Sequence, residues 1–99
     1  MNLQQLQTLL VVVETGSFSA AARRLQKAQS AVSSAIAELE IDLGVTLFDR
    51  SKRYPQLTDA GERVWQQACV IHRQCQALNQ HGNHDEHVED AHVHAHFLR

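Results

Sequence analysis

Apolar residues recur every three or four positions along most of the chain, which is the spacing of one face of an α-helix. The first such stretch includes Leu3, Leu6 and the run at residues 9–13. Two further sets follow, formed by Phe18, Ala21, Ala22 and Leu25 and by Val32, Ile36, Leu39 and Leu43. Residues 26–28 between these two sets are too few to hold anything but a turn. The pattern therefore predicts an amino-terminal helix followed by two short helices that pack together across a tight turn.

The outward face of the helix that begins near residue 29 carries only short or uncharged side chains. They are Gln29, Ser30, Ser33, Ser34 and Ala37. Glutamine can pair with adenine, and serine can form hydrogen bonds with bases or phosphates. We therefore predict that this helix reads double-stranded DNA through Gln29, Ser30, Ser33 and Ser34, while the preceding helix supports it. For an isolated helix, a solvated polar face is the commoner explanation, and the motifs that surround this helix pair are what favour DNA reading.

Several short motifs surround this helix pair at fixed distances along the chain. They are Leu6-Gln7-Thr8-Leu9, Val13-Glu14-Thr15-Gly16-Ser17-Phe18-Ser19-Ala20-Ala21-Ala22, Gln29-Ser30-Ala31-Val32-Ser33 with Ile36, Leu39 and Glu40, Leu43-Gly44-Val45, Leu47-Phe48-Asp49-Arg50, Arg53, and Leu57-Thr58-Asp59-Ala60-Gly61. With these motifs the chain resembles the amino-terminal domain of the LysR-type transcriptional regulators, from Leu3 to about Leu78. The resemblance implies a mainly α-helical fold, a winged helix-turn-helix of three helices and a short two-stranded wing, followed by a long dimerisation helix. We expect the winged domain at residues 1–58, the linker helix at 59–80 and a disordered tail at 81–99.

Basic residues are expected to add contacts with the DNA backbone. In the wing, short strands at residues 47–48 and 56–57 would flank a polar tip at 49–55, and this tip holds three of the nine basic residues. Such a cluster suits phosphate or minor-groove contact, although any surface loop can carry these charges. The predicted backbone contacts are Arg50, Lys52 and Arg53 in the wing and Arg23, Arg24 and Lys27 in the support helix and the turn.

Two positions depart from the family pattern. Ala28 stands where relatives usually have a serine that caps the recognition helix, and alanine is a poorer cap by typically ~1 kcal/mol. We therefore expect a frayed or late start of this helix, with Ser30 or Gln29 taking over locally. Ala37-Glu38 stands where many relatives carry a basic residue, which predicts modest affinity from this helix.

After Gly61 the chain reads as one long helix with a heptad seam. Its apolar positions are spaced four, three, four and three residues apart, at Val64, Ala68, Ile71, Cys75 and Leu78. A lone helix cannot bury such a stripe on a domain that is already filled, so a partner helix is expected. The family resemblance suggests the same helix of a second subunit, packed antiparallel, which would make the target an inverted repeat. The alternative is that the stripe packs on its own domain.

Composition and charge set the outer bounds of these predictions. At 99 residues and 43% hydrophobic residues, the chain suffices for one small domain with an extension. Residues 81–99 hold four acids and one base, a net charge of −3. Because the whole chain carries −2, residues 1–80 carry +1, and the predicted domain is only weakly basic. Neither a signal peptide nor a membrane-spanning segment is predicted, and Cys69 and Cys75 lie too far apart along a helix for a disulfide. A reducing cytoplasm is therefore the expected setting.

The tail holds six of the seven histidines, at positions 81, 84, 87, 92, 94 and 96. Histidine-rich tracts can bind zinc, nickel or copper, but this spacing fits no defined metal site, and we assign no metal or cofactor. We also assign no catalytic residue, because no catalytic arrangement is tied to a recognisable scaffold. The resemblance stops near Leu78, where family members continue into an effector-binding domain, so no small-molecule effector site is expected in this chain. The alternatives to a DNA-binding regulator are a truncated module that heterodimerises with full-length relatives and a protein with a metal-binding tail.

Overall fold

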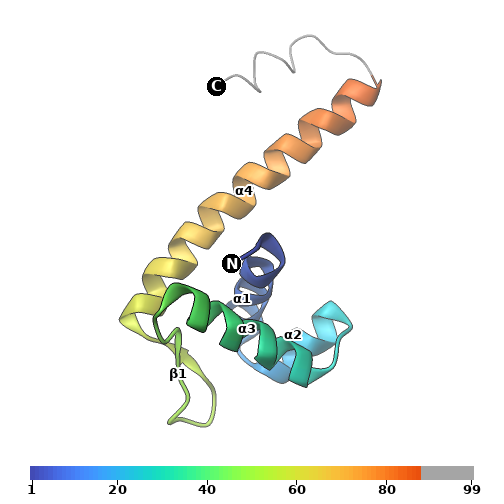
Figure 1. The fold of residues 1–99 in the computed structure, drawn as a ribbon. Helices are drawn as coiled ribbons and strands as arrows, with labels where there is room; N and C mark the ends of the chain where they lie inside the picture. The colour runs from blue at the N-terminus through green and yellow to red at the C-terminus, as the bar shows by residue number, and fades with distance from the viewer. Residues whose placement is uncertain (88–99) are drawn as a thin grey trace. The chain divides into compact units, whose positions relative to one another are not determined.

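The computed structural model describes the backbone of residues 1–87 and the side chains of residues 1–78. The elements follow the order α1 (Leu3–Thr15), α2 (Phe18–Leu25), α3 (Gln29–Leu43), β1 (Phe48–Asp49), β2 (Gln56–Leu57) and α4 (Asp59–His87). Figure 1 shows α1, α2 and α3 gathered together, with the strand hairpin following α3. Residues 1–69 form one compact unit, and the described residues from 70 to 87 belong to a second. The predicted winged helix-turn-helix and long helix are therefore confirmed, and α4 continues beyond residue 80, the end predicted for it, to His87.

Local signals fix both ends of α1 and the start of α2. The side chain of Asn2 accepts a hydrogen bond from the Gln5 amide at 2.8 Å, and the Gln5 side chain accepts one from the Asn2 amide at 3.1 Å, which forms a capping box. Gly16 ends α1 in the left-handed region, at φ 86°. Ser17 directly follows and caps α2 by accepting a hydrogen bond from the Ala20 amide at 3.0 Å. One helix therefore ends and the next begins within two residues.

The turn between α2 and α3 uses a left-handed residue that is not glycine. Gln26 has φ 58°, and the amide of Lys27 donates to the Ala22 carbonyl oxygen at 3.0 Å. Helix α3 then begins at Gln29 although Ala28 provides no side-chain cap. The expected late helix start is therefore wrong, while the missing cap is confirmed. The Ala28 carbonyl still accepts from the Ala31 amide at 3.0 Å, so the first turn closes without the cap.

The core lies where one face of each helix meets the first strand. The buried hydrophobic residues are Leu6, Leu9, Val12, Ala21, Ala22, Val32, Ile36, Leu39, Leu47, Phe48 and Ala68. Within the apolar run 9–13 of α1, Leu10 and Val13, which the spacing also allows in the core, are only half-buried, whereas Leu9 and Val12 are fully covered. Residues 9–13 are all apolar, so the sequence pattern alone leaves the rotation of this helix about its axis undecided.

The wing is a short antiparallel hairpin that is joined firmly to the start of α4. Phe48 pairs with Leu57 and Asp49 pairs with Gln56, so the first strand lies one residue later than predicted. The Thr58 amide donates to the Leu47 carbonyl oxygen at 2.9 Å, and the Thr58 hydroxyl accepts from the Gly61 amide at 2.9 Å. Thr58 therefore caps α4 and ties it to the residue before β1. None of the helices in the described part of the chain is long and apolar enough to span a membrane.

Candidate nucleic-acid interface

The first two turns of α3 present the predicted reading residues. Gln29, Ser30 and Ser34 are exposed and Ser33 is half-buried. Within residues 1–78, none of these four side chains forms a hydrogen bond with another group of the protein. The opposite face of α3 buries Val32, Ile36 and Leu39, and α3 packs against both α1 and α2. The core thus fixes the direction of α3 while its polar side chains stay free to bond to another molecule.

The basic residues of α2 and of the turn before α3 are all exposed, but one of them, Arg24, forms an ion pair within the chain. Arg23 and Arg24 lie in the last turn of α2, where cations also interact favourably with the helix dipole. Arg24 forms an ion pair with Glu14 at 3.2 Å, with both side chains more than half exposed. Exposed pairs of this kind contribute about 0–1 kcal/mol, so this pair does not prevent Arg24 from reaching a phosphate. Lys27 lies exposed in the turn itself.

The tip of the wing is a second cationic position. Lys52 and Arg53 are exposed; the Lys52 ammonium lies 3.5 Å from the Gln56 amide oxygen, and the Arg53 guanidinium lies 5.6 Å from the centre of the Tyr54 ring. Tyr54, itself 57% exposed, was not among the predicted site residues. The sequence feature that could have indicated Tyr54 as a site residue is its position directly after Arg53 in the polar tip of the wing. Tyrosine and arginine together offer a ring, a hydroxyl and a planar cation to a partner.

Asp49 shapes the entry to this tip. Its carboxylate accepts hydrogen bonds from the Ser51 amide at 3.0 Å and from the Ser51 hydroxyl at 2.7 Å. These two bonds, helped by the charge of Lys52, lower the pKa of Asp49 below its ordinary value of 3.8. The turn is therefore held by an ionised carboxylate.

Arg50 has different surroundings from the other two wing cations. Its guanidinium lies 3.8 Å from the Glu40 carboxylate of α3 and 5.2 Å from the centre of the Phe18 ring of α2. The Phe18 ring in turn meets the Phe48 ring edge to face, with centroids 5.6 Å apart. Arg50 thus contacts α3 and α2, whereas the sequence prediction grouped it with Lys52 and Arg53 as a contact of the DNA backbone. The partners Glu40 and Phe18 lie in α3 and α2, so no local pattern around Arg50 indicates these contacts.

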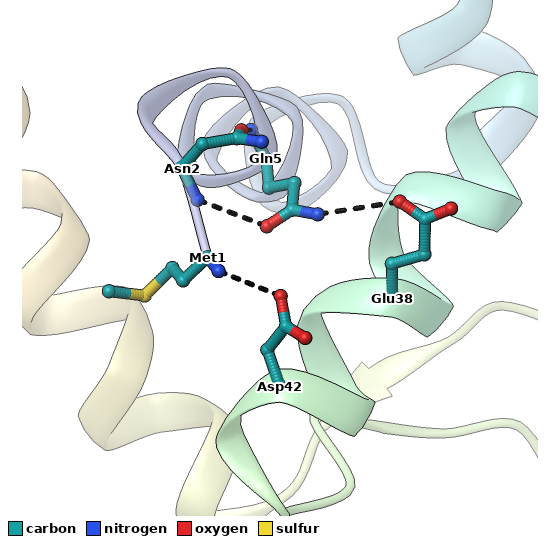
Figure 2. Close-up of polar contacts among 5 residues, drawn as sticks. All are labelled: Met1, Asn2, Gln5, Glu38 and Asp42. Atoms are coloured by element: carbon teal, nitrogen blue, oxygen red, sulfur yellow. Dashed lines mark hydrogen bonds and ion pairs between the residues drawn. The ribbon is translucent and has the colours of Figure 1, made fainter.

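Two of the three acidic residues of α3, Glu38 and Asp42, contact α1 or the residues that precede it. Figure 2 shows the Gln5 side chain donating to the Glu38 carboxylate, at 3.4 Å, and the terminal amine of Met1 paired with Asp42, at 2.7 Å. Glu38 was noted above as an acid where relatives carry a base. In the structure its carboxylate bonds to α1, which explains how an acid fits at this position of α3.

The predicted seam on α4 is only partly free for a partner. Val64, Ile71 and Cys75 are half-buried and Leu78 is 51% exposed, but Ala68 is 1% exposed. Ala68 belongs to the compact unit of residues 1–69 and is buried, so its side chain offers no free surface to a partner helix, unlike the prediction that placed it in the dimer interface. For this one position, the alternative of packing on the chain's own domain holds.

The cysteines and histidines show no assembled site in the described part of the chain. Cys69 and Cys75 are free thiols, and no group of three potential metal ligands comes together among the described residues. The tail histidines that could bind a metal include His92, His94 and His96, which lie outside the described residues.

Comparison with known proteins agrees with this geometry. Residues 3–62 match the family of bacterial regulatory helix-turn-helix proteins of the lysR type. The chain is 57% identical over 68 residues to the probable HTH-type transcriptional regulator LrrA of Synechococcus elongatus, covering 69% of this chain and 23% of that protein. It is 45% identical over 85 residues to the HTH-type transcriptional regulator AceR of Acinetobacter baumannii, covering 84% of this chain and 29% of that one. The chain thus spans less than a third of the length of these two relatives.

Solved structures give the same result. The DNA-binding domain of BenM, in a complex with benA site 1 DNA, matches with a TM-score of 0.83 and 29% identity over 90% of this chain and all of that one. The CbnR DNA-binding domain, also crystallised as a DNA complex, matches with a TM-score of 0.78 and 34% identity over 84% of this chain and 95% of that one. The chain therefore belongs to the LysR family of bacterial transcriptional regulators and carries its winged helix-turn-helix DNA-binding domain.

Proposed function

We propose that this chain binds an inverted-repeat DNA sequence as a homodimer and thereby regulates transcription. The observation that carries the proposal is the free polar face of α3, where Gln29, Ser30, Ser33 and Ser34 have no hydrogen-bond partners among residues 1–78, in a domain whose wing also exposes cations. Side chains of this kind can read base edges in the major groove, while Lys52 and Arg53 contact phosphates. Two solved relatives of the same fold were crystallised with DNA, which supports the choice of ligand.

The weak net charge of the domain makes bivalent binding important. Residues 1–80 carry only +1, so a strong overall field does not draw this domain to DNA. In a dimer, two recognition helices bind half-sites about 34 Å apart, and the second contact becomes intramolecular. Local cations and a second subunit together replace the missing long-range attraction.

The dimer would form through the part of α4 that the domain does not cover. Val64, Ile71, Cys75 and Leu78 keep the heptad spacing after Ala68 is removed from the set, and Leu78 is 51% exposed. An apolar stripe of this length is costly to leave in water, and an antiparallel copy of the same helix would cover it. With two free thiols and a family of DNA-binding regulators, we place the protein in the reducing cytoplasm.

The first test is selection from a pool of random duplex DNA at moderate salt, followed by sequencing of the retained fraction. Enrichment of an inverted repeat is the expected result and would also give the operator. If the folded protein enriches no motif, sequence reading by this chain is refuted, and the alternative of a module that pairs with full-length relatives takes its place.

The second test separates backbone contacts from base contacts. Arg53→Ala should weaken binding to every duplex and lower the slope of log K against log salt by about one unit. Arg73→Ala, which removes the same charge from an exposed position on α4, is the matched control and should change the slope much less. Gln29→Ala should instead change the preferred sequence more than the general affinity. Equal losses on all sequences would remove Gln29 from the reading face.

The third test concerns the dimer. Ile71→Asp places a charge in the proposed interface and should give a monomer with a folded winged domain, measured by sedimentation and circular dichroism. Gln74→Asp introduces the same charge at an exposed position of the same helix and should remain dimeric. If Ile71→Asp also remains dimeric, the interface lies elsewhere.

A further inference from the structure

The Glu40 carboxylate lies at a junction of α3 and the wing. Its side chain is 15% exposed, and one oxygen, Oε2, accepts hydrogen bonds from the amides of Leu47, at 2.8 Å, and Phe48, at 3.4 Å. The other oxygen, Oε1, lies 3.8 Å from the Arg50 guanidinium. One carboxylate of the recognition helix therefore holds both the backbone that enters β1 and the cation that follows it. Hydrogen bonds to an ionised acceptor are stronger than neutral ones, so this attachment is firm.

Arg50 continues the connection to α2. Its guanidinium lies over the ring of Phe18, the first residue of α2, and the Phe18 ring packs edge to face on Phe48 of β1 at an interplanar angle of 86°. Arg50 thus contacts α3 through Glu40 and α2 through Phe18. A planar guanidinium suits both contacts at once, because it pairs with a carboxylate in its plane and stacks on a ring with its face.

We propose that Arg50 is a positioning residue that fixes the wing relative to the recognition helix, and that the phosphate contacts of the wing come from Lys52 and Arg53. This inference rests on the DNA-binding function proposed above and refines it. The Glu40 charge offsets most of the attraction that Arg50 has for a phosphate, and moving Arg50 to a phosphate would leave a mostly covered carboxylate without its cation. Among residues 1–78, neither Lys52 nor Arg53 pairs with a carboxylate.

The free protein provides a test that needs no DNA. Amide hydrogen exchange should speed up in β1 and β2 when the connection is broken by Arg50→Ala or Glu40→Gln, because the hairpin loses its attachment to α3. Arg50→Met keeps the aliphatic stem against Phe18 and removes only the charge, so it serves if the alanine variant unfolds. Lys52→Ala is the matched control from the same hairpin. Unchanged exchange in the Arg50 and Glu40 variants would overturn the proposal.

Binding of a mixed-sequence duplex, followed by its salt dependence, gives the second readout. Arg50→Ala should weaken binding roughly three- to tenfold with little change in the salt slope, whereas Lys52→Ala should lower the slope by about one unit. Glu40→Gln removes a negative charge, so a purely electrostatic effect would tighten binding, whereas the lost connection should weaken it. The double variant should bind no more weakly than Arg50→Ala alone.

The outcomes separate this inference from the function on which it rests. A slope lowered by about one unit in Arg50→Ala, or tighter binding by Glu40→Gln, would show that Arg50 is itself a phosphate contact and would overturn the proposal. Absence of DNA binding by the unaltered chain would instead overturn the proposed function. In that case the hydrogen-exchange experiment still decides whether Arg50 fixes the wing.

Discussion

Gly61 lies where α4 passes the backbone at the start of the wing, and its replacement by alanine tests that contact. A Cβ atom built on Gly61 would lie well within 3.0 Å of the Leu47 carbonyl oxygen, 2.9 Å from Leu57 Cδ2 and 3.0 Å from the Leu47 carbonyl carbon. The nearest obstacle is backbone, which cannot rotate away as a flexible side chain could. Gly61→Ala therefore requires either the helix or the wing to move.

The expected cost follows from the bonds that this movement disturbs. The Leu47 carbonyl accepts from the Thr58 amide at 2.9 Å, and the Thr58 hydroxyl accepts from the Gly61 amide at 2.9 Å. Losing or stretching these bonds costs about 1 kcal/mol each, and the steric displacement adds about 1–3 kcal/mol. Alanine gains back roughly 1 kcal/mol of helix propensity. We expect Gly61→Ala to lower the free energy of unfolding by about 2–4 kcal/mol.

Urea unfolding followed by the fluorescence of Trp65 and by circular dichroism measures this change. The matched variant is Gly44→Ala, where a Cβ would meet nothing within 4 Å and the only obstacle is the left-handed φ of 71°. That strain costs about 1–2 kcal/mol and leaves the wing in place. If Gly61→Ala is as stable as the unaltered chain or more stable, the close approach of α4 to Leu47 is wrong.

Three further predictions concern helix caps, the core and the wing turn. Ala28→Ser should supply the missing cap of α3 and raise the free energy of unfolding by about 1 kcal/mol, whereas Ser17→Ala should lower it by a similar amount, both measured in urea; equal stability of all three chains would refute the cap assignments. Leu9→Ala, at a side chain with 0% exposure, should cost about 2–5 kcal/mol and leave little cooperative unfolding. An NMR titration of the Ser51 amide should show a midpoint below pH 3.8, because the pKa of Asp49 is lowered in the fold. The ionised Asp49 therefore stabilises the turn fully at pH values above 3.8, and this contribution is lost as the pH falls through the lowered pKa of Asp49. A midpoint at or above 3.8 would contradict the hydrogen bonds from Ser51.

The sequence predicted the order of elements because each helix has its own apolar period. It did not decide which face of α1 is buried, since residues 9–13 are apolar throughout and both Leu9 and Leu10 fit the period. The tertiary structure decides for Leu9, which is 0% exposed. Likewise Ala68 fits a heptad seam equally well whether its own chain or a partner covers it, and only the structure shows that it is buried within the single chain, at 1% exposure.

The sequence pattern predicted which side chains at the start of α3 are exposed, but it did not predict which basic residues of the wing have partners in other elements. The exposed residues at the start of α3 follow from helical period alone. Arg50 and Arg53 look alike in the sequence, but the first is held by Glu40, ten positions earlier, and by Phe18, in another helix. Ion pairs and ring contacts between elements depend on the fold, so the pattern of charges in the wing did not distinguish the two arginines.

The free polar face of α3 also bears on how proteins of this kind diverge. Gln29, Ser30 and Ser34 are exposed and bond to no other group among residues 1–78, so substitutions there leave the core and the helix contacts untouched. Surface changes of this type usually alter stability by no more than about 0.5 kcal/mol. A duplicated gene could therefore exchange these side chains one at a time and acquire a new target while the fold remains stable at every step. Glu40, Arg50 and Gly61 cannot be exchanged in this way, because each lies against backbone or a charged group outside its own element.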